Sequence, residues 1–381
     1  MSKKELGIYV HIPFCMKKCY YCDFISYANK KEVISNYIDV LKKEITTVGA
    51  GIVSLLTPIT TIYIGGGTPS YIDSNYIVSI IDTIKETFKV KENAEITIEV
   101  NPGTVTKEKL ENYIKCGINR LSIGLQSTDN NLLKEIGRIH TYEQFLDTYK
   151  LAKEVGFKNI NVDLMLALPN QTIEMLEDSL IKVIKLNPEH ISVYSLILEE
   201  GTYLCNLVES KKITLPDENT ERDMYWLVKK ELEKNGYKHY EISNFAKSGY
   251  ASKHNLNCWN QEEYISFGLA AHSYVNNTRY SNTENLQEYL NAFEKNTNIV
   301  TIHEKQETED KPKEYMMLGL RKIDGVQISD FKNKFVQNPL YLFRKELDKL
   351  VREELIEIDG DSIKLTNKGL DLANIVFSEF V

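Results

Sequence analysis

The fold of this chain is limited above all by a repeated alternation of strand-like and helical segments. Short runs rich in β-branched residues predict strands over Leu6 to Ile12, Thr60 to Ile64, Glu95 to Val100, Arg120 to Gly124, Asn159 to Leu166 and His190 to Leu198. Segments with a helical period lie near residues 30–48, 77–88, 106–116, 141–155, 173–186 and 219–235. Strands joined through helices need crossover connections, so the sheet should be parallel with the helices outside it. The sequence therefore predicts an α/β fold, a partial (β/α) barrel whose functional residues lie at the carboxyl ends of the strands.

The rhythm changes after Asn244, which predicts a barrel over residues 1–244, a loop-rich extension and linker over 245–311, and a small domain over 312–381. The charged stretch His303 to Lys313 is typical of a linker. The last part indicates three or four helices and a hairpin, Leu355 to Leu365, that turns on Asp359-Gly360. This order is similar to a winged-helix domain. Its expected recognition region, Leu340 to Glu354, mixes basic and acidic side chains and so does not favour DNA binding.

Three cysteines, Cys15, Cys19 and Cys22, follow the first strand within eight residues. Cysteine thiolates are the usual ligands of iron-sulfur clusters, and three of them on a four-iron cluster leave one iron open to another ligand. A structural zinc site with His11 as fourth ligand is the alternative, and an odd number of thiols disfavours a disulfide. On spacing alone, a cluster and a zinc site both remain open.

Other polar and glycine-rich positions also follow predicted strands. The run Gly65-Gly66-Gly67-Thr68-Pro69 lets backbone approach a ligand closely, although it also suits a tight turn. Carboxylates at strand ends suit ribose hydroxyls, and an arginine suits a ligand carboxylate. The residues of this kind are Glu99, Gln126, Arg138 and Asp163, each of which has the alternative of a solvated polar group or a cap.

The C-x3-C-x2-C spacing resembles the signature of the radical S-adenosylmethionine (SAM) superfamily. The resemblance implies that the open iron binds the amino and carboxylate groups of SAM, and that an electron from the cluster cleaves the cofactor to a 5'-deoxyadenosyl radical. It also implies that the glycine run after the next strand holds the SAM amino group. The cofactor then carries the demanding chemistry, and the protein binds and orients it.

A wider set of residues resembles the oxygen-independent coproporphyrinogen III dehydrogenase, or HemN-like, family over nearly the whole chain. In that family Tyr9 and Tyr21 would flank cluster and SAM, and Ile197 would lie near the adenine. The alternative is that Tyr9 and Tyr21, two of the 23 tyrosines in the chain, are ordinary aromatic side chains at the rim of the barrel. The positions that the resemblance assigns to SAM are Gly66, Gly67, Thr68, Glu99, Gln126, Arg138 and Asp163.

The family contains two functions: the dehydrogenase, which decarboxylates two propionates in porphyrin biosynthesis, and the HemW-type haem chaperone. The dehydrogenase's cysteine motif continues as C-x-C, whereas Phe24 stands here, and its long arm before the first strand is missing. The segment His254-Asn-Leu-Asn-Cys258-Trp259 resembles the chaperone motif H-N-x-x-Y-W, with cysteine in place of tyrosine. The resemblance therefore implies a haem chaperone, with His254 as candidate haem ligand and Cys258 or His272 as the next candidates. The alternative is a purely structural role, in which His254 caps a turn and Trp259 packs in the hydrophobic core.

The implied cofactors and partners are a [4Fe-4S] cluster, SAM, haem as the carried ligand, haem-accepting proteins and an electron donor to the cluster. A net charge of −8 argues against wholesale binding of nucleic acid or anionic membrane, and no apolar run is long enough to span a membrane. The sequence thus predicts a cytoplasmic protein. It leaves open a peripheral membrane contact, a homodimer and a radical reaction, and assigns no catalytic residue.

Overall fold

The central feature is one open sheet of twelve strands in the order β14-β13-β12-β11-β1-β4-β5-β6-β7-β8-β10-β9. The computed structural model describes residues 5–52, 57–292, 299–305 and 309–381. Neighbours pair in parallel and in chain order along β1 (Leu6–Ile12), β4 (Ile59–Gly66), β5 (Val90–Val100), β6 (Arg120–Gln126), β7 (Ile160–Leu166) and β8 (His190–Ser195). This arrangement confirms the predicted α/β fold with parallel strands, and it places their carboxyl ends along one edge.

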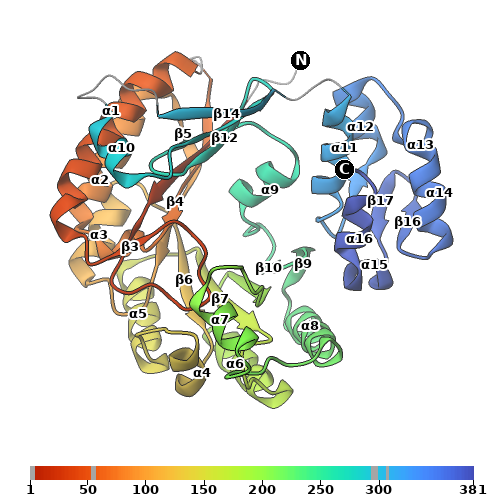
Figure 1. Cartoon of the computed structure of the whole chain (residues 1–381), viewed down its shortest axis with the longest axis horizontal. Helices are drawn as coiled ribbons and strands as arrows, with labels where there is room; N and C mark the ends of the chain where they lie inside the picture. The colour runs from red at the N-terminus through yellow and green to blue at the C-terminus, as the bar shows by residue number, and fades with distance from the viewer. Residues whose placement is uncertain (1–4, 53–56, 293–298, 306–308) are drawn as a thin grey trace.

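Helices cover the outer face of these strands, as Figure 1 shows for α1, α2, α3 and α5. The crossover helices are α1 (Ile34–Ile52), α2 (Ser74–Thr87), α3 (Lys107–Lys115), α5 (Tyr142–Val155), α6 (Ile173–Leu186) and α8 (Glu218–Lys234). Most begin where a side-chain oxygen accepts a hydrogen bond from the first turn, as Asp73 does for α2 and Thr141 for α5. In α2 the isoleucine stripe that predicted the helix is fully buried in the main core.

Short elements shape the loops above the strand ends. Strand β2 (Phe14–Cys15) pairs with β3 (Tyr27–Ala28), which joins the two ends of the cysteine loop. The 3-10 helices η1 (Lys31–Val33) and η2 (Pro69–Tyr71) and the helices α4 (Asn130–Glu135) and α7 (Tyr203–Glu209) complete this set.

The expectation of a loop-rich extension over residues 245–311 was wrong, because most of this segment joins the sheet. Strand β11 pairs in parallel with β1, and β12 to β14 continue antiparallel from it. The elements are β9 (Lys238–Glu241), β10 (Asn244–Ala246), α9 (Lys253–Trp259), β11 (Tyr264–Phe267), β12 (His272–Val275), β13 (Thr278–Asn282), α10 (Leu286–Asn291) and β14 (Val300–Lys305). These strands are short and rich in polar residues, so they lack the apolar runs that marked the parallel strands. The expected linker begins inside β14, and its residues 306–308 lie outside the described residues.

The carboxyl-terminal residues build a small unit with its own core, drawn in blue in Figure 1. It contains α11 (Asp310–Gly319), β15 (Val326–Gln327), α12 (Ile328–Phe335), α13 (Pro339–Leu342), α14 (Arg344–Arg352), β16 (Ile356–Asp359), β17 (Ser362–Leu365), α15 (Asn367–Asp371) and α16 (Ala373–Ser378). The predicted hairpin is present as β16 and β17, and β15 adds an unpredicted third strand. Among the described residues, no helix is both long and apolar enough to cross a membrane.

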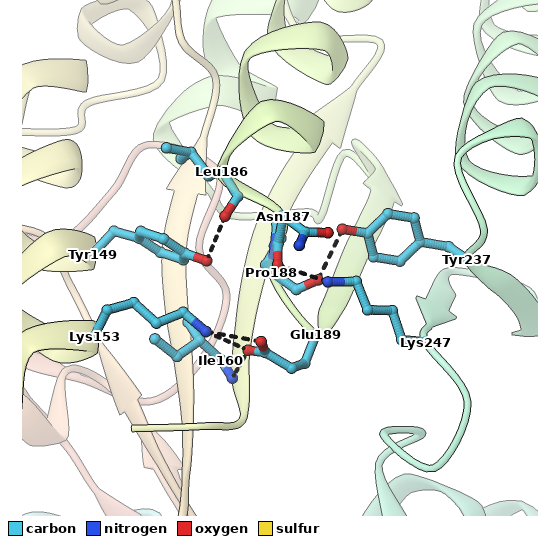
Figure 2. Close-up of polar contacts among 9 residues, drawn as sticks. All are labelled: Tyr149, Lys153, Ile160, Leu186, Asn187, Pro188, Glu189, Tyr237 and Lys247. Atoms are coloured by element: carbon cyan, nitrogen blue, oxygen red, sulfur yellow. Dashed lines mark hydrogen bonds and ion pairs between the residues drawn. The ribbon is translucent and has the colours of Figure 1, made fainter. Parts of the chain in front are cut away.

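The connection from α6 to β8 is held by side chains from three other segments, namely helix α5, Tyr237 and Lys247 (Figure 2). The hydroxyls of Tyr149 and Tyr237 donate to the carbonyls of Leu186 and Pro188, at 3.0 and 2.8 Å. The carboxylate of Glu189 accepts from Lys153 Nζ at 2.8 Å and from the backbone N–H of Ile160 at 3.1 Å. Glu189 therefore secures the starts of two neighbouring parallel strands, β7 and β8.

We expect Glu189→Ala to lower the free energy of unfolding by about 1–3 kcal/mol, because it leaves the Ile160 N–H and the Lys153 ammonium without their acceptor. The matched control is Asp178→Ala, which breaks the exposed Lys182–Asp178 pair on α6 and should cost less than about 0.5 kcal/mol. Urea denaturation followed by circular dichroism measures both. Equal effects would show that Glu189 is not an anchor.

Candidate functional site

A cavity of about 420 Å³ lies at the carboxyl ends of the parallel strands. It is lined by most of the residues that the sequence singled out: Cys15, Cys19, Tyr21, Cys22, Gly66, Gly67, Thr68, Glu99, Gln126, Arg138 and Asp163. Tyr9, Ile197 and His254 do not line it. The cavity also takes in Tyr63, Asn101, Ser122 and Tyr194, which sequence reasoning missed. Asn101 could have been found from its spacing, because it lies two residues beyond Glu99 at the end of the same strand.

The cysteine loop is held against the end of β4 by backbone hydrogen bonds. Gly67 N donates to Ile12 O and Thr68 N to Phe14 O, both at 2.9 Å. A Cβ atom on Gly67 would lie 3.0 Å from Cys15 Sγ and 2.9 Å from Phe14 N, so no larger residue fits there without a shift. The glycine run is thus more than a turn, since it lets the cysteine loop lie directly on the strand end.

The thiols of this loop are buried or half-buried. Burial raises the pKa of Cys22 to about 11 and also raises the pKa of Cys15. Thr68 Oγ1 lies 3.6 Å from Cys15 Sγ and can donate to it. Such thiols remain neutral until a metal centre binds and stabilises the thiolates.

The zinc alternative lacks its fourth ligand, because both ring nitrogens of His11 are engaged below the cavity. Nε2 donates to the carbonyl of Ile25 at 2.9 Å, so Nδ1 is left to accept from the Tyr9 hydroxyl at 3.0 Å. Within the described ranges, no three His, Cys, Asp or Glu side chains converge closely enough to hold one metal ion. An iron-sulfur cluster needs no such convergence, since each thiolate binds a different iron.

A chain of polar contacts leads from the cysteine loop across the strand ends to Arg138. Asn101 Nδ2 donates to Thr68 Oγ1 at 2.9 Å, and Arg138 Nη1 donates to Asn101 Oδ1 at 2.8 Å. Arg138 Nε is buried and has no hydrogen-bond partner, and its guanidinium lies 6.0 Å from the centre of the Tyr21 ring. The unpaired donor makes Arg138 suited to an anionic ligand group in the cavity.

Two carboxylates face this arginine. Glu99 accepts from Tyr63 Oη at 3.0 Å and from Gly66 N at 3.1 Å, and burial together with the charge of Asp163 raises its pKa to about 7. Asp163 accepts from Asn161 Nδ2 at 2.7 Å and Ser122 Oγ at 3.1 Å, and burial raises its pKa too. The cavity thus pairs a cation with acceptors, as a zwitterionic ligand requires.

Gln126 reaches the cavity through a local break in the sheet. The register between β6 and β7 shifts between Gly124 and Gln126, and Gln126 has a φ of 72°. A Cβ on Gly124 would lie 3.1 Å from Arg138 Nη2 and equally close to Asn101 Oδ1 and Gln126 Nε2. The irregular strand end therefore leaves room for these three polar groups.

The sequence candidate His254 lies in the barrel interior and is only 8% exposed. Its Nδ1 is 2.9 Å from Thr61 Oγ1, and its ring stacks on Tyr63 at 5.3 Å. Thr61 pairs with Gly7 near the amino ends of β4 and β1, whereas the cysteine loop follows their carboxyl ends. Burial and the charge of Arg120 lower the pKa of His254 to about 4, so the imidazole is neutral.

The other two candidates outside the cavity have different surroundings. Tyr9 lies beneath it, with its hydroxyl on His11 and its ring 6.2 Å from that of Tyr63. Ile197 follows β8 and is 68% exposed.

Comparison with known proteins agrees with this geometry. The model of the radical SAM superfamily matches residues 9–183, and that of the HemN C-terminal domain matches residues 307–372. The chain is 38% identical over 383 residues to the heme chaperone HemW of Lactococcus lactis, with 100% of this chain and 98% of that protein covered. The chain belongs to the HemW family of radical SAM proteins.

Other HemW proteins support this assignment, and one solved structure shows the same fold. Identity to HemW of Bacillus subtilis is 38% over 98% of both chains, and identity to HemW of Escherichia coli is 39% over 71% of this chain and 70% of that protein. The coproporphyrinogen III oxidase (HemN) of Escherichia coli, a radical SAM enzyme, has the same fold. Its TM-score is 0.86 at 24% identity, with 99% of this chain and 90% of that chain covered.

Membership of the radical SAM superfamily implies a [4Fe-4S] cluster and SAM, and the residues of this cavity fit both. Three thiols lie on its wall without a fourth cysteine among its lining residues. The unpaired Arg138 Nε suits the SAM carboxylate, and the ionised form of Glu99 suits its ammonium or ribose hydroxyls.

We expect anaerobic reconstitution to load one oxygen-sensitive [4Fe-4S] cluster per chain, and Cys22→Ala to abolish it, because two thiolates cannot hold a cluster that needs three. Iron and sulfide analysis together with visible absorbance measures the cluster. Cys205→Ala is the matched control and should load normally, since Cys205 lies on α7 outside the cavity. Zinc without sulfide in the wild-type protein would contradict the assignment.

Proposed function

We propose that this chain is a haem chaperone, which binds haem and passes it to acceptor proteins. The observation that carries the proposal is the full-length similarity to proteins named heme chaperone HemW, at 38% identity over 98–100% of this chain. Haem is the cargo in this proposal, and haem-accepting proteins and an electron donor to the cluster are its partners. We further propose that the protein works in the cytoplasm.

The cavity would hold the resident cofactors of the chaperone. Cys15, Cys19 and Cys22 would each bind one iron of the cluster, leaving the fourth iron for SAM. When bound, this pair of cofactors supplies one-electron chemistry. We assign the SAM contacts to Gly66, Gly67, Thr68, Glu99, Gln126, Arg138 and Asp163, with Tyr9 and Tyr21 beside cluster and SAM and Ile197 near the adenine.

The side chains would orient SAM through charge and hydrogen bonds. Arg138 is held in place by Asn101, so its free donor can bind the SAM carboxylate without losing that support. The Glu99 carboxylate accepts hydrogen bonds from the Tyr63 hydroxyl and the Gly66 N–H, so it lies beside the glycine run at the end of β4. The binding groups are thus fixed before the ligand arrives, which lowers the entropic cost of binding.

Coproporphyrinogen dehydrogenase activity is the second candidate function. It is favoured because every position that the family resemblance assigns to SAM is present in the cavity. The shared HemN fold accommodates either function, so it does not decide between them. Phe24 stands where the dehydrogenase motif has a further cysteine, and its ring is 62% exposed at the edge of the cavity. This difference favours the chaperone.

SAM affinity should rise as the pH increases through about 7, the pKa of Glu99. Above that pH the carboxyl group is ionised and accepts hydrogen bonds from the cofactor, whereas below it the neutral acid binds the cation poorly. Between about pH 6 and about pH 8 the gain should reach about tenfold at most. Isothermal titration calorimetry on the reconstituted protein measures it, and Glu99→Gln should remove this component. A wild-type profile identical to that of Glu99→Gln would remove Glu99 from the site.

The reconstituted protein should bind haem and should form no protoporphyrinogen from coproporphyrinogen III, SAM and a reductant. The expected readouts are a saturable Soret band on haem titration and no product peak in chromatography. The coproporphyrinogen III oxidase of Escherichia coli serves as the positive control for product formation. Product formation at the rate of that enzyme would overturn the chaperone proposal in favour of the second candidate.

A further inference from the structure

Large apolar side chains are exposed around the mouth of the cysteine cavity. Met16, Phe24, Ile139 and Tyr203 are 51–62% exposed, although residues of these types are usually buried. They come from three separate segments: the cysteine loop, the turn after Arg138, and the start of α7. We call these four residues the apolar rim. A concentration of this kind on a soluble protein marks an interaction site rather than chance exposure.

The four residues of the apolar rim line three hollows that adjoin at Cys19. Phe24 lines the cofactor cavity, and Tyr203 lines a second hollow of about 470 Å³ between the cysteine loop and residues 200–203. Met16 and Ile139 line a third hollow beside Arg138. Cys19 lines all three, so a ligand lying over this thiol would contact the rim on several sides.

The charges beside the rim indicate what kind of apolar ligand fits. Lys17 and Lys18 follow Met16 directly and are exposed, on a chain whose net charge is −8. Lys17 Nζ lies 5.1 Å from the centre of the Tyr20 ring, and Lys18 Nζ donates to Phe24 O at 3.0 Å. Asp23 and Glu200 line the second hollow with Lys18, so the cationic part of the mouth is on the side of Met16 and Lys17. A flat apolar ring with acidic groups at one edge matches this pattern, and haem has this form.

Two of the three side chains expected from sequence to bind haem iron, His254 and Cys258, are poorly placed for it, whereas His272 is exposed at the start of β12. His254 is buried near the amino ends of β1 and β4 and bonded to Thr61. Cys258 is half-buried on the same short helix as His254, α9 (Lys253–Trp259), and does not belong to the apolar rim. Met16 carries the exposed thioether of the rim, and thioether sulfur is an established haem ligand.

We infer that haem docks on the apolar rim over Cys19, with its propionates toward Lys17, and not on His254. This inference rests on the proposed haem-binding function and adds the location of the haem. The cargo then lies beside the cluster and SAM, so both cofactors are within reach of the haem during loading or release.

The test is haem titration of the full, cluster-loaded protein, followed by the Soret band. Ile139→Ser/Tyr203→Ser removes two rim contacts outside the cysteine loop and should weaken haem affinity about tenfold or more. Tyr341→Ser/Ile375→Ser is the matched control, since it removes the same two residue types from exposed positions (80% and 50%) on the C-terminal unit, and its affinity should stay within about twofold. Iron and sulfide content of each variant verifies that the fold and the cluster are intact. Met16→Leu keeps the apolar contact and removes the sulfur, so a shifted Soret band with retained binding would identify the ligand.

His254→Gln separates the two locations, because glutamine can keep the contact with Thr61. We expect it to leave haem affinity within about twofold of the wild type. Loss of haem binding in a folded His254→Gln variant, together with full binding in the rim variants, would overturn the inference. The haem site would then lie at His254 on α9. Unchanged haem affinity in all variants would show that haem does not dock on the apolar rim, and would leave the proposed function standing. Absence of haem binding by the wild-type protein would overturn the proposed function itself.

Discussion

The candidate site depends on the close contact between the cysteine loop and the end of strand β4. Two backbone hydrogen bonds make this contact, and the missing side chain of Gly67 allows it. From there the polar chain through Thr68 and Asn101 fixes Arg138, so a thiol and a guanidinium from distant segments take up one arrangement. Because the strands are parallel and in chain order, each new strand end adds another group to the same edge.

A second set of contacts supports this edge from below. Tyr63 stacks on His254 and donates to Glu99, so the interior aromatic rings hold a carboxylate that faces the cavity. The helix α9 that carries His254 is tied to the sheet through Glu95, which accepts from the backbone N–H groups of Lys253 and His254 at 3.1 Å. At its other end Trp259 lies beneath the guanidinium of Arg321, 4.6 Å from the ring centre. The motif over residues 254–259 thus joins the barrel interior to the C-terminal unit.

The parallel part of the fold was predictable from the sequence, and the antiparallel part was not. Buried parallel strands such as β4 and β7 are rich in β-branched and other apolar residues, and they stand out between amphipathic helices. Strands β12 and β13 contain serine, arginine and asparagine, and they are strands because each pairs with a neighbour. Their signal lies in hydrogen bonds between segments rather than in local periodicity, so a loop-rich reading of residues 245–300 was the natural error.

The sequence by itself determined the chemistry of the cavity: three thiols in one loop, glycines after the next strand, and charged groups at successive strand ends. These follow from residue type and spacing, and the family resemblance rests on the same residues. Only the tertiary structure decided which candidates share a cavity, that both ring nitrogens of His11 are bonded to Tyr9 and Ile25, and that apolar side chains are exposed at the mouth. The physical reason is that burial depends on contacts between distant segments. His254 is buried by Thr61, which lies 193 residues away in the chain, and no local pattern around either residue records that contact.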